Sequence, residues 1–113
     1  MSKYEIIFYQ SKSGKNQILD FINKLMIKDK AKITWILELL IQHGKSLSHP
    51  YLKFLKNSQD IWELRPKNYR IFLSFIEEKN IILLHIIVKK TNKTPKKDIK
   101  LAQKRLNEYL RRN

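Results

Sequence analysis

The sequence has 113 residues, of which 42% are hydrophobic, so residues 1–113 fit one domain with one modest core. It contains no cysteine, two glycines and three prolines, which excludes disulfides and thiolate metal sites and argues against a disordered chain. Lysine and arginine number 24 against 10 aspartates and glutamates, and the formal net charge of +14 favours a polyanionic partner, nucleic acid first.

The first part of the sequence predicts a strand and two helices. The segment "YEIIFY" (residues 4–9) is β-branched and aromatic, as strands are. From Asn16 onward apolar residues recur at helical spacing, and "KDK" (28–30) interrupts that pattern. A second helix, "AKITWILELLIQHG" (31–44), ends where Gly44 suits a helix terminus. We therefore expect a helical hairpin after the first strand.

The next segments predict strands joined by short turns. A loop, "SLSHPYLKFL" (46–55), leads toward a short strand. Apolar and polar residues alternate in "IWELRP" (61–66) and in "YRIFLSFIE" (69–77), as in strands with one buried face. The turn "EEKN" (77–80) then leads into "IILLHIIVK" (81–89), which is apolar throughout and so indicates a central strand covered on both faces.

A basic helix ends the chain. Thr94 suits the N-cap and Pro95 the first helical position. From Lys89 to Asn113 there are ten basic residues and two acidic ones. The order of elements predicts an α+β fold, with an N-terminal strand, a helical hairpin, a three- to four-stranded antiparallel sheet and a C-terminal helix.

No segment suits a membrane or a metal. The longest apolar runs are far shorter than the roughly 20 residues of a bilayer span, and the N-terminus lacks the apolar core of a signal peptide. We therefore expect a cytoplasmic protein that does not bind membranes. Three scattered histidines make zinc improbable, and we expect no metal and no cofactor.

Four cations are candidates for chemistry. Arg65 and Arg70 flank one turn, and the change of alternation at Pro66 lets both face one side of the sheet. Lys89 and Lys90 end the following strand, so all four are expected to converge on one face of the sheet or its rim. RNA is cut without metal when its 2′-hydroxyl attacks the adjacent phosphorus. Arginines stabilise the charge that develops, and a lysine crowded by other cations can act as base or acid.

Several of these residues also have a structural interpretation. Arg65 with Glu63 can be one half of a cross-strand ion pair, and Arg70 can cap a turn or pair with Glu77 or Glu78. His85 lies inside an apolar strand, where a hydrogen-bonded structural histidine is common, and Tyr69 can be a core residue rather than a base-stacking one. The predicted RNA-binding residues are Lys93, Lys96, Lys97, Lys100, Lys104, Tyr69 and His85.

Three segments together resemble a known family. "IWELRP", "YRIF" and "LLHIIVKKTNKTPKKDIKLAQKRL", preceded by "HPYLKFL", resemble in order and spacing the RelE/HigB toxins of bacterial toxin–antitoxin modules. The "KKTxKTP" turn into the last helix is the most specific of these features. The resemblance covers about the whole chain and is strongest over residues 49–110.

The resemblance implies an endoribonuclease that cuts mRNA in the ribosomal decoding site without metal. It also implies a helix-turn-helix antitoxin that silences the toxin in a hetero-oligomer. Carried over to this sequence, the family's basic site residues match Arg65, Arg70, Lys89 and Lys90. Residues 91–94 lack the tyrosine that some relatives use, so base and acid are not assigned.

Two other functions stay open. A non-catalytic basic nucleic-acid-binding protein, either a degenerate toxin or a phage-derived accessory protein, would have the same net charge, because counterion release alone gives salt-sensitive binding. A module that binds an acidic protein is the third hypothesis. Clustering of the four cations on one surface would favour the nuclease.

Overall fold

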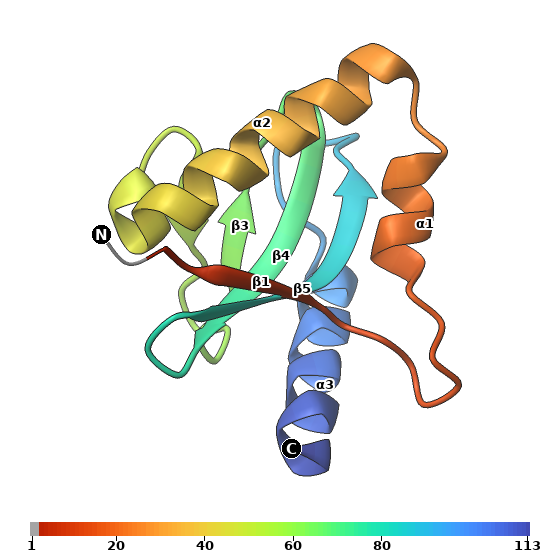
Figure 1. Cartoon of the computed structure of the whole chain (residues 1–113), viewed down its shortest axis with the longest axis vertical. Coiled ribbons are helices and arrows are strands. Elements are labelled where there is room, and N and C mark those ends of the chain that lie inside the picture. The colour runs from red at the N-terminus through yellow and green to blue at the C-terminus, as the bar shows by residue number, and fades with distance from the viewer. Residues whose placement is uncertain (1–2) are drawn as a thin grey trace.

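The computed structural model describes residues 3–113, and in this part of the chain five strands form one sheet with helices on both faces (Figure 1). The strands are β1 (Glu5–Phe8), β2 (Leu52–Phe54), β3 (Trp62–Leu64), β4 (Tyr69–Ile76) and β5 (Asn80–Val88). The helices are α1 (Gln17–Asn23), α2 (Ile27–His43) and α3 (Lys96–Arg112), with a short 3-10 helix, η1, at Gly44–Leu47. The predicted α+β class is confirmed.

The sheet is mixed, with the strand order β1-β5-β4-β3-β2. Strands β2 to β5 pair antiparallel, as the short turns between them predicted. The N-terminal strand extends the sheet to five, since β1 lies parallel to β5, with Glu5 opposite Asn80 and Phe8 opposite Leu83. The sequence predicted this strand but not its partner, because the two segments are separated by α1, α2 and three strands.

The two helices after β1 differ from the prediction in their bounds. Asn16 caps α1, since its side chain accepts a hydrogen bond from the N–H of Leu19 at 3.1 Å. The break between the helices falls at residues 24–26 and α2 begins at Ile27, so the "KDK" segment lies inside α2. Asp29 of that segment is in the first turn, where the helix dipole stabilises a negative charge.

The two faces of β4 contact different helices. Tyr69 packs edge-on against Phe21 of α1, with the ring centroids 6.1 Å apart. The neighbouring Arg70 and the fully buried Phe72 point to the other face, which α3 covers (Figure 1). The face of the sheet under α3 therefore holds Arg70 of the predicted site.

The central strand β5 is buried on both faces, as its apolar sequence predicted. Its register with β4 shifts between Phe72 and Leu73, and the shift leaves Leu84 without a partner in β4. Arg105 of α3 supplies the missing partner, since its Nη1 donates to the carbonyl oxygen of Leu84 at 2.8 Å.

Over residues 3–113, no helix combines the length and hydropathy that crossing a membrane requires.

Candidate functional site

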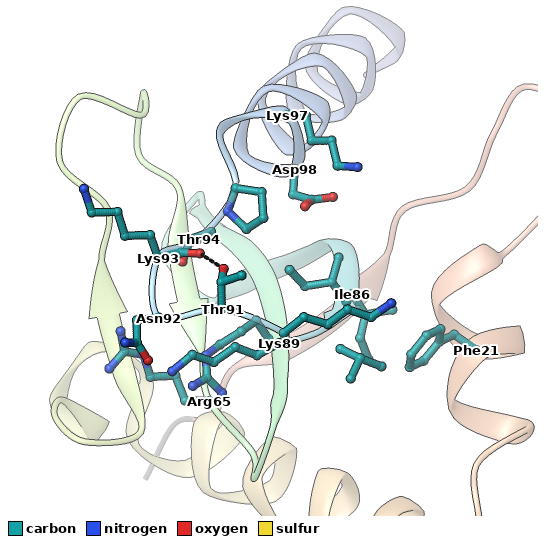
Figure 2. A pocket seen from close by; sticks show the side chains of 15 residues that line it. Phe21, Arg65, Ile86, Lys89, Thr91, Asn92, Lys93, Thr94, Lys97 and Asp98 are labelled. Atoms are coloured by element: carbon teal, nitrogen blue, oxygen red, sulfur yellow. Dashed lines mark hydrogen bonds between the residues drawn. The ribbon is translucent and has the colours of Figure 1, made fainter.

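A pocket of about 450 Å³ lies where β5 runs into the segment before α3 (Figure 2). In Figure 2 that segment crosses the middle of the view, with the first turn of α3 above it and Phe21 at one side. The lining residues are Phe21, Arg65, Arg70, Ile86, Ile87, Val88, Lys89, Lys90, Thr91, Asn92, Lys93, Thr94, Pro95, Lys97 and Asp98.

The four predicted catalytic residues all line this pocket. Arg65 directly follows β3 and Arg70 lies in β4, and the turn between them brings both to the pocket. Lys89 and Lys90 follow β5, and the N–H of Lys89 donates to the carbonyl oxygen of Asn68 at 2.6 Å. That bond fixes the end of β5 beside the β3–β4 turn. The structure thus brings the four cations together, and their catalytic roles stay a prediction.

Each arginine is held in place by a different contact. Arg65 Nε donates to Glu63 Oε1 at 3.0 Å, so this ion pair runs along one strand rather than across two. Arg70 Nη1 donates to the carbonyl oxygens of Lys67 at 3.0 Å and Tyr69 at 2.6 Å, which caps the turn. A guanidinium has five N–H donors, so these contacts leave donors on both arginines for a ligand.

Glu63 joins β3 to the segment before α3. Its side chain is fully buried, and its Oε2 accepts the hydroxyl of Thr94 at 2.5 Å. The prediction that Thr94 caps α3 is therefore wrong: the N-cap is Pro95, and no side chain caps the helix. The sequence offered no signal for this bond, because the residues lie on separate elements 31 positions apart.

The segment after β5 is closed by its own hydrogen bond, in which the Thr91 hydroxyl donates to the carbonyl oxygen of Lys93 at 2.8 Å. Lys93 and Lys97, two of the predicted RNA-binding residues, line the pocket and point to opposite sides in Figure 2. Sequence reasoning missed Asn92, which adds an amide, and Phe21, which adds an aromatic ring from a distant helix.

The pocket is strongly electropositive. Its lining contains one carboxylate, Asp98, and six basic residues: Arg65, Arg70, Lys89, Lys90, Lys93 and Lys97. Burial lowers the pKa of Arg70, the nearby Glu63 opposes that shift, and Arg65 adds to it. Arginine stays charged in proteins, so the pocket presents fixed positive charge and planar donors. Such a lining has the charge and donors that suit phosphate or another oxyanion.

Two predicted RNA-binding residues lie outside this pocket. The Tyr69 hydroxyl donates to Asp29 Oδ2 at 2.6 Å on the face of α1 and α2, and this bond raises the pKa of Tyr69. His85 Nε2 lies 2.8 Å from Asp98 Oδ1, and its ring stacks on Phe72. Both side chains have structural contacts, which favours the structural interpretation of each.

The other predicted RNA-binding lysines lie along α3. Lys96 and Lys100 line a separate groove, and Lys104 is exposed one turn further along the helix. Within residues 3–113, no group of three histidine, aspartate or glutamate side chains is arranged to hold a metal ion. Metal-independent action remains a prediction.

The sequence was compared with known proteins. Residues 20–107, most of the chain, match the family model described as "Phage derived protein Gp49-like (DUF891)". A search of curated proteins finds no significant match. The matched segment contains β2 to β5 and most of α3, and with them every residue that lines the pocket. The chain therefore belongs to the phage-derived Gp49-like family, which is toxin-like and related to the RelE/HigB toxins.

Proposed function

We propose that the protein is the toxin of a toxin–antitoxin module and a metal-independent endoribonuclease that cleaves mRNA on the ribosome. The observation that carries this proposal is the convergence of Arg65, Arg70, Lys89 and Lys90 on one pocket. Membership in a toxin-like family supports the toxin role. Its partner would be a helix-turn-helix antitoxin, bound in a hetero-oligomer.

The proposed reaction is an internal transesterification. The 2′-oxygen attacks the adjacent phosphorus, the bond from phosphorus to the 5′-oxygen breaks, and the products are a 2′,3′-cyclic phosphate and a 5′-hydroxyl. One group removes the proton of the 2′-hydroxyl and another protonates the leaving 5′-oxygen. Arg65 and Arg70 donate to the phosphorane oxygens, and Lys89 and Lys90 are the candidates for proton transfer.

One observation favours the second candidate, a protein that binds RNA without cutting it. Among residues 3–113, no histidine lines the pocket, and the only lining carboxylate, Asp98, is hydrogen-bonded to His85. Phosphate contacts alone would give salt-sensitive binding. A degenerate toxin or a phage-derived accessory protein would act in this way.

Induced expression with mapping of RNA ends tests the proposal. We expect growth arrest and new 5′-hydroxyl ends within translated mRNA. Arg70→Lys keeps the charge but loses the planar fork, and Lys89→Gln with Lys90→Gln removes the proposed proton-transfer groups. Each variant should reduce cleavage about 100-fold or more.

The matched control for the double lysine variant is Lys12→Gln with Lys15→Gln. It also removes two positive charges, but from an exposed loop, and it should cleave RNA as the wild type does. Unchanged growth and intact transcripts, with folded protein present, would refute the toxin proposal. RNA binding without cleavage would establish the second candidate.

A further inference from the structure

A second groove runs between α3 and the edge of the sheet at β2. Two adjoining hollows, of about 390 and 410 Å³, share Lys56 and Ile99 and so form one continuous surface, the lateral groove. It is lined by Lys53, Phe54, Leu55, Lys56, Asn57, Lys96, Ile99, Lys100 and Gln103.

The two walls of the lateral groove are basic. Lys53 and Lys56 stand on the side of β2 and of the connection that follows it. Lys96 and Lys100 are four residues apart in α3, so they project from the same face of the helix. In the part of the chain that the structure describes, no acidic residue lines the groove, and the half-buried Ile99 lies between the walls. Four lysines that line one channel repel one another, and a bound anion relieves that repulsion.

The wall on the side of the sheet is rigid. Ser58, which is 1% exposed, bonds to the carbonyl oxygens of Leu55 and Ile61 and accepts the N–H of Ile61 at 3.1 Å. The N–H of Leu55 also donates to the carbonyl oxygen of Ile61 at 3.0 Å. These bonds close the connection between β2 and β3 and hold Lys56 and Asn57 in position. A fixed wall costs less ordering entropy when a ligand binds.

The lateral groove and the pocket meet at the first turn of α3. Lys97 lines the pocket and the adjacent Lys96 lines the groove. Lys93 lines the pocket as well but points away from Lys97 (Figure 2). Positive charge therefore continues from the pocket around the start of α3 into the groove.

We propose that the lateral groove binds the backbone phosphates of RNA outside the cleavage pocket. The inference rests on the proposed function for its ligand. Lysines bind phosphate as point charges, so the groove adds affinity without reading sequence, and Ile99 offers an apolar contact to a ribose or base. The RNA is either the continuation of the strand in the pocket or ribosomal RNA.

Binding of strands of two lengths tests the proposal. The probes are 2′-O-methyl oligonucleotides, which cannot be cleaved, of about 4 and about 12 nucleotides. The groove variant carries Lys53→Gln, Lys56→Gln, Lys96→Gln and Lys100→Gln. The matched control carries Lys12→Gln, Lys15→Gln, Lys24→Gln and Lys28→Gln, four exposed lysines outside both sites. Fluorescence anisotropy at several salt concentrations measures the affinities for the oligonucleotides. Sedimentation with ribosomes measures ribosome binding.

We expect the groove variant to bind the longer strand at least tenfold more weakly than the control does. Its slope of log affinity against log salt should fall by about 0.7 for each phosphate that the groove no longer neutralises. Both variants should bind the short strand alike. If only ribosome binding is weakened, ribosomal RNA is the ligand of the groove. Equal affinities of the two variants, for strands and for ribosomes, would overturn the inference.

Failure of the inference and failure of the proposed function give different results. If the wild type cleaves no RNA while the groove variant binds the longer strand more weakly, the nuclease proposal is refuted. The proposal that the lateral groove binds RNA is then supported. If the wild type cleaves RNA and the two variants bind alike, only the lateral groove is refuted.

Discussion

His85 is a half-buried ionisable group whose environment favours its neutral form. Burial among the residues under α3 lowers the pKa of His85 from its ordinary value of 6.5, and Arg105 acts in the same direction. The hydrogen bond to Asp98 and the charge of that carboxylate oppose the shift. Since the net direction is downward, the unfolded chain binds a proton more readily than the folded chain at this residue.

The stability of the protein should therefore fall as the pH drops below about 6.5, because the unfolded state then takes up a proton that the folded state excludes. Urea denaturation from about pH 7.5 to about pH 5.5 measures this loss. His85→Gln keeps a donor for Asp98 and should lose less stability over the same interval. Asp98→Asn removes the opposing charge and should lose more. Equal pH dependence in all three proteins would refute this account of His85.

At the scale of residues, sequence reasoning succeeded where strand alternation applies. Arg65 and Arg70 could be placed on one side of the sheet because only a short turn separates them. Contacts between distant elements were not accessible: the bond from Thr94 to Glu63 and the hydrogen bond from Tyr69 to Asp29 depend on how α3 and α2 pack. No pattern of neighbouring residues in the sequence predicts these two hydrogen bonds.

Gly44 decides how α2 ends and how the chain turns toward β2. It is the C-cap of α2, as predicted, with φ at +56° and ψ at −134°. A Cβ atom at this position would collide with the ring of Tyr4, which lies just before β1. The positive φ therefore favours glycine here, and any other residue would also have to displace the ring of Tyr4.

Gly44→Ala should lower the free energy of unfolding by about 2–4 kcal/mol, because it adds a steric collision to backbone strain. Gly14→Ala is the control: Gly14 also has a positive φ, +84°, but nothing lies within 4 Å of the added Cβ. Strain alone should cost about 1 kcal/mol there. Urea denaturation of both variants measures the difference. Equal losses of unfolding free energy would show that the Tyr4 ring moves aside without destabilising the protein.

At the scale of elements, short-range signals were informative and long-range pairing was not. The antiparallel order from β2 to β5 follows from hairpin turns, and the turn before β5 was predicted without a glycine. The parallel pairing of β1 with β5 crosses most of the chain. The start of α2 was misplaced because its first turn is charged and its first residue, Ile27, is exposed.

The whole molecule carries a formal charge of +14 in a body whose extents are 36 × 35 × 29 Å. Raising the NaCl concentration from about 0.01 M to about 0.1 M shortens the screening length from about 30 Å to about 10 Å. At the lower concentration most cations in the molecule therefore repel one another, whereas at the higher one only neighbours do. The pocket and the lateral groove concentrate this repulsion, which a bound polyanion would relieve.

Added salt should therefore stabilise the free protein. We expect the free energy of unfolding to rise by about 1 kcal/mol between these two NaCl concentrations, which raises the Tm by about 4 °C in a domain of this size. The variant with Lys12, Lys15, Lys24 and Lys28 changed to glutamine has a formal charge of +10, four below the wild type, and should gain less. Thermal denaturation monitored by circular dichroism measures both proteins. A Tm that falls with salt would mean that local ion pairs, such as that of Lys67 with Asp29, outweigh the repulsion.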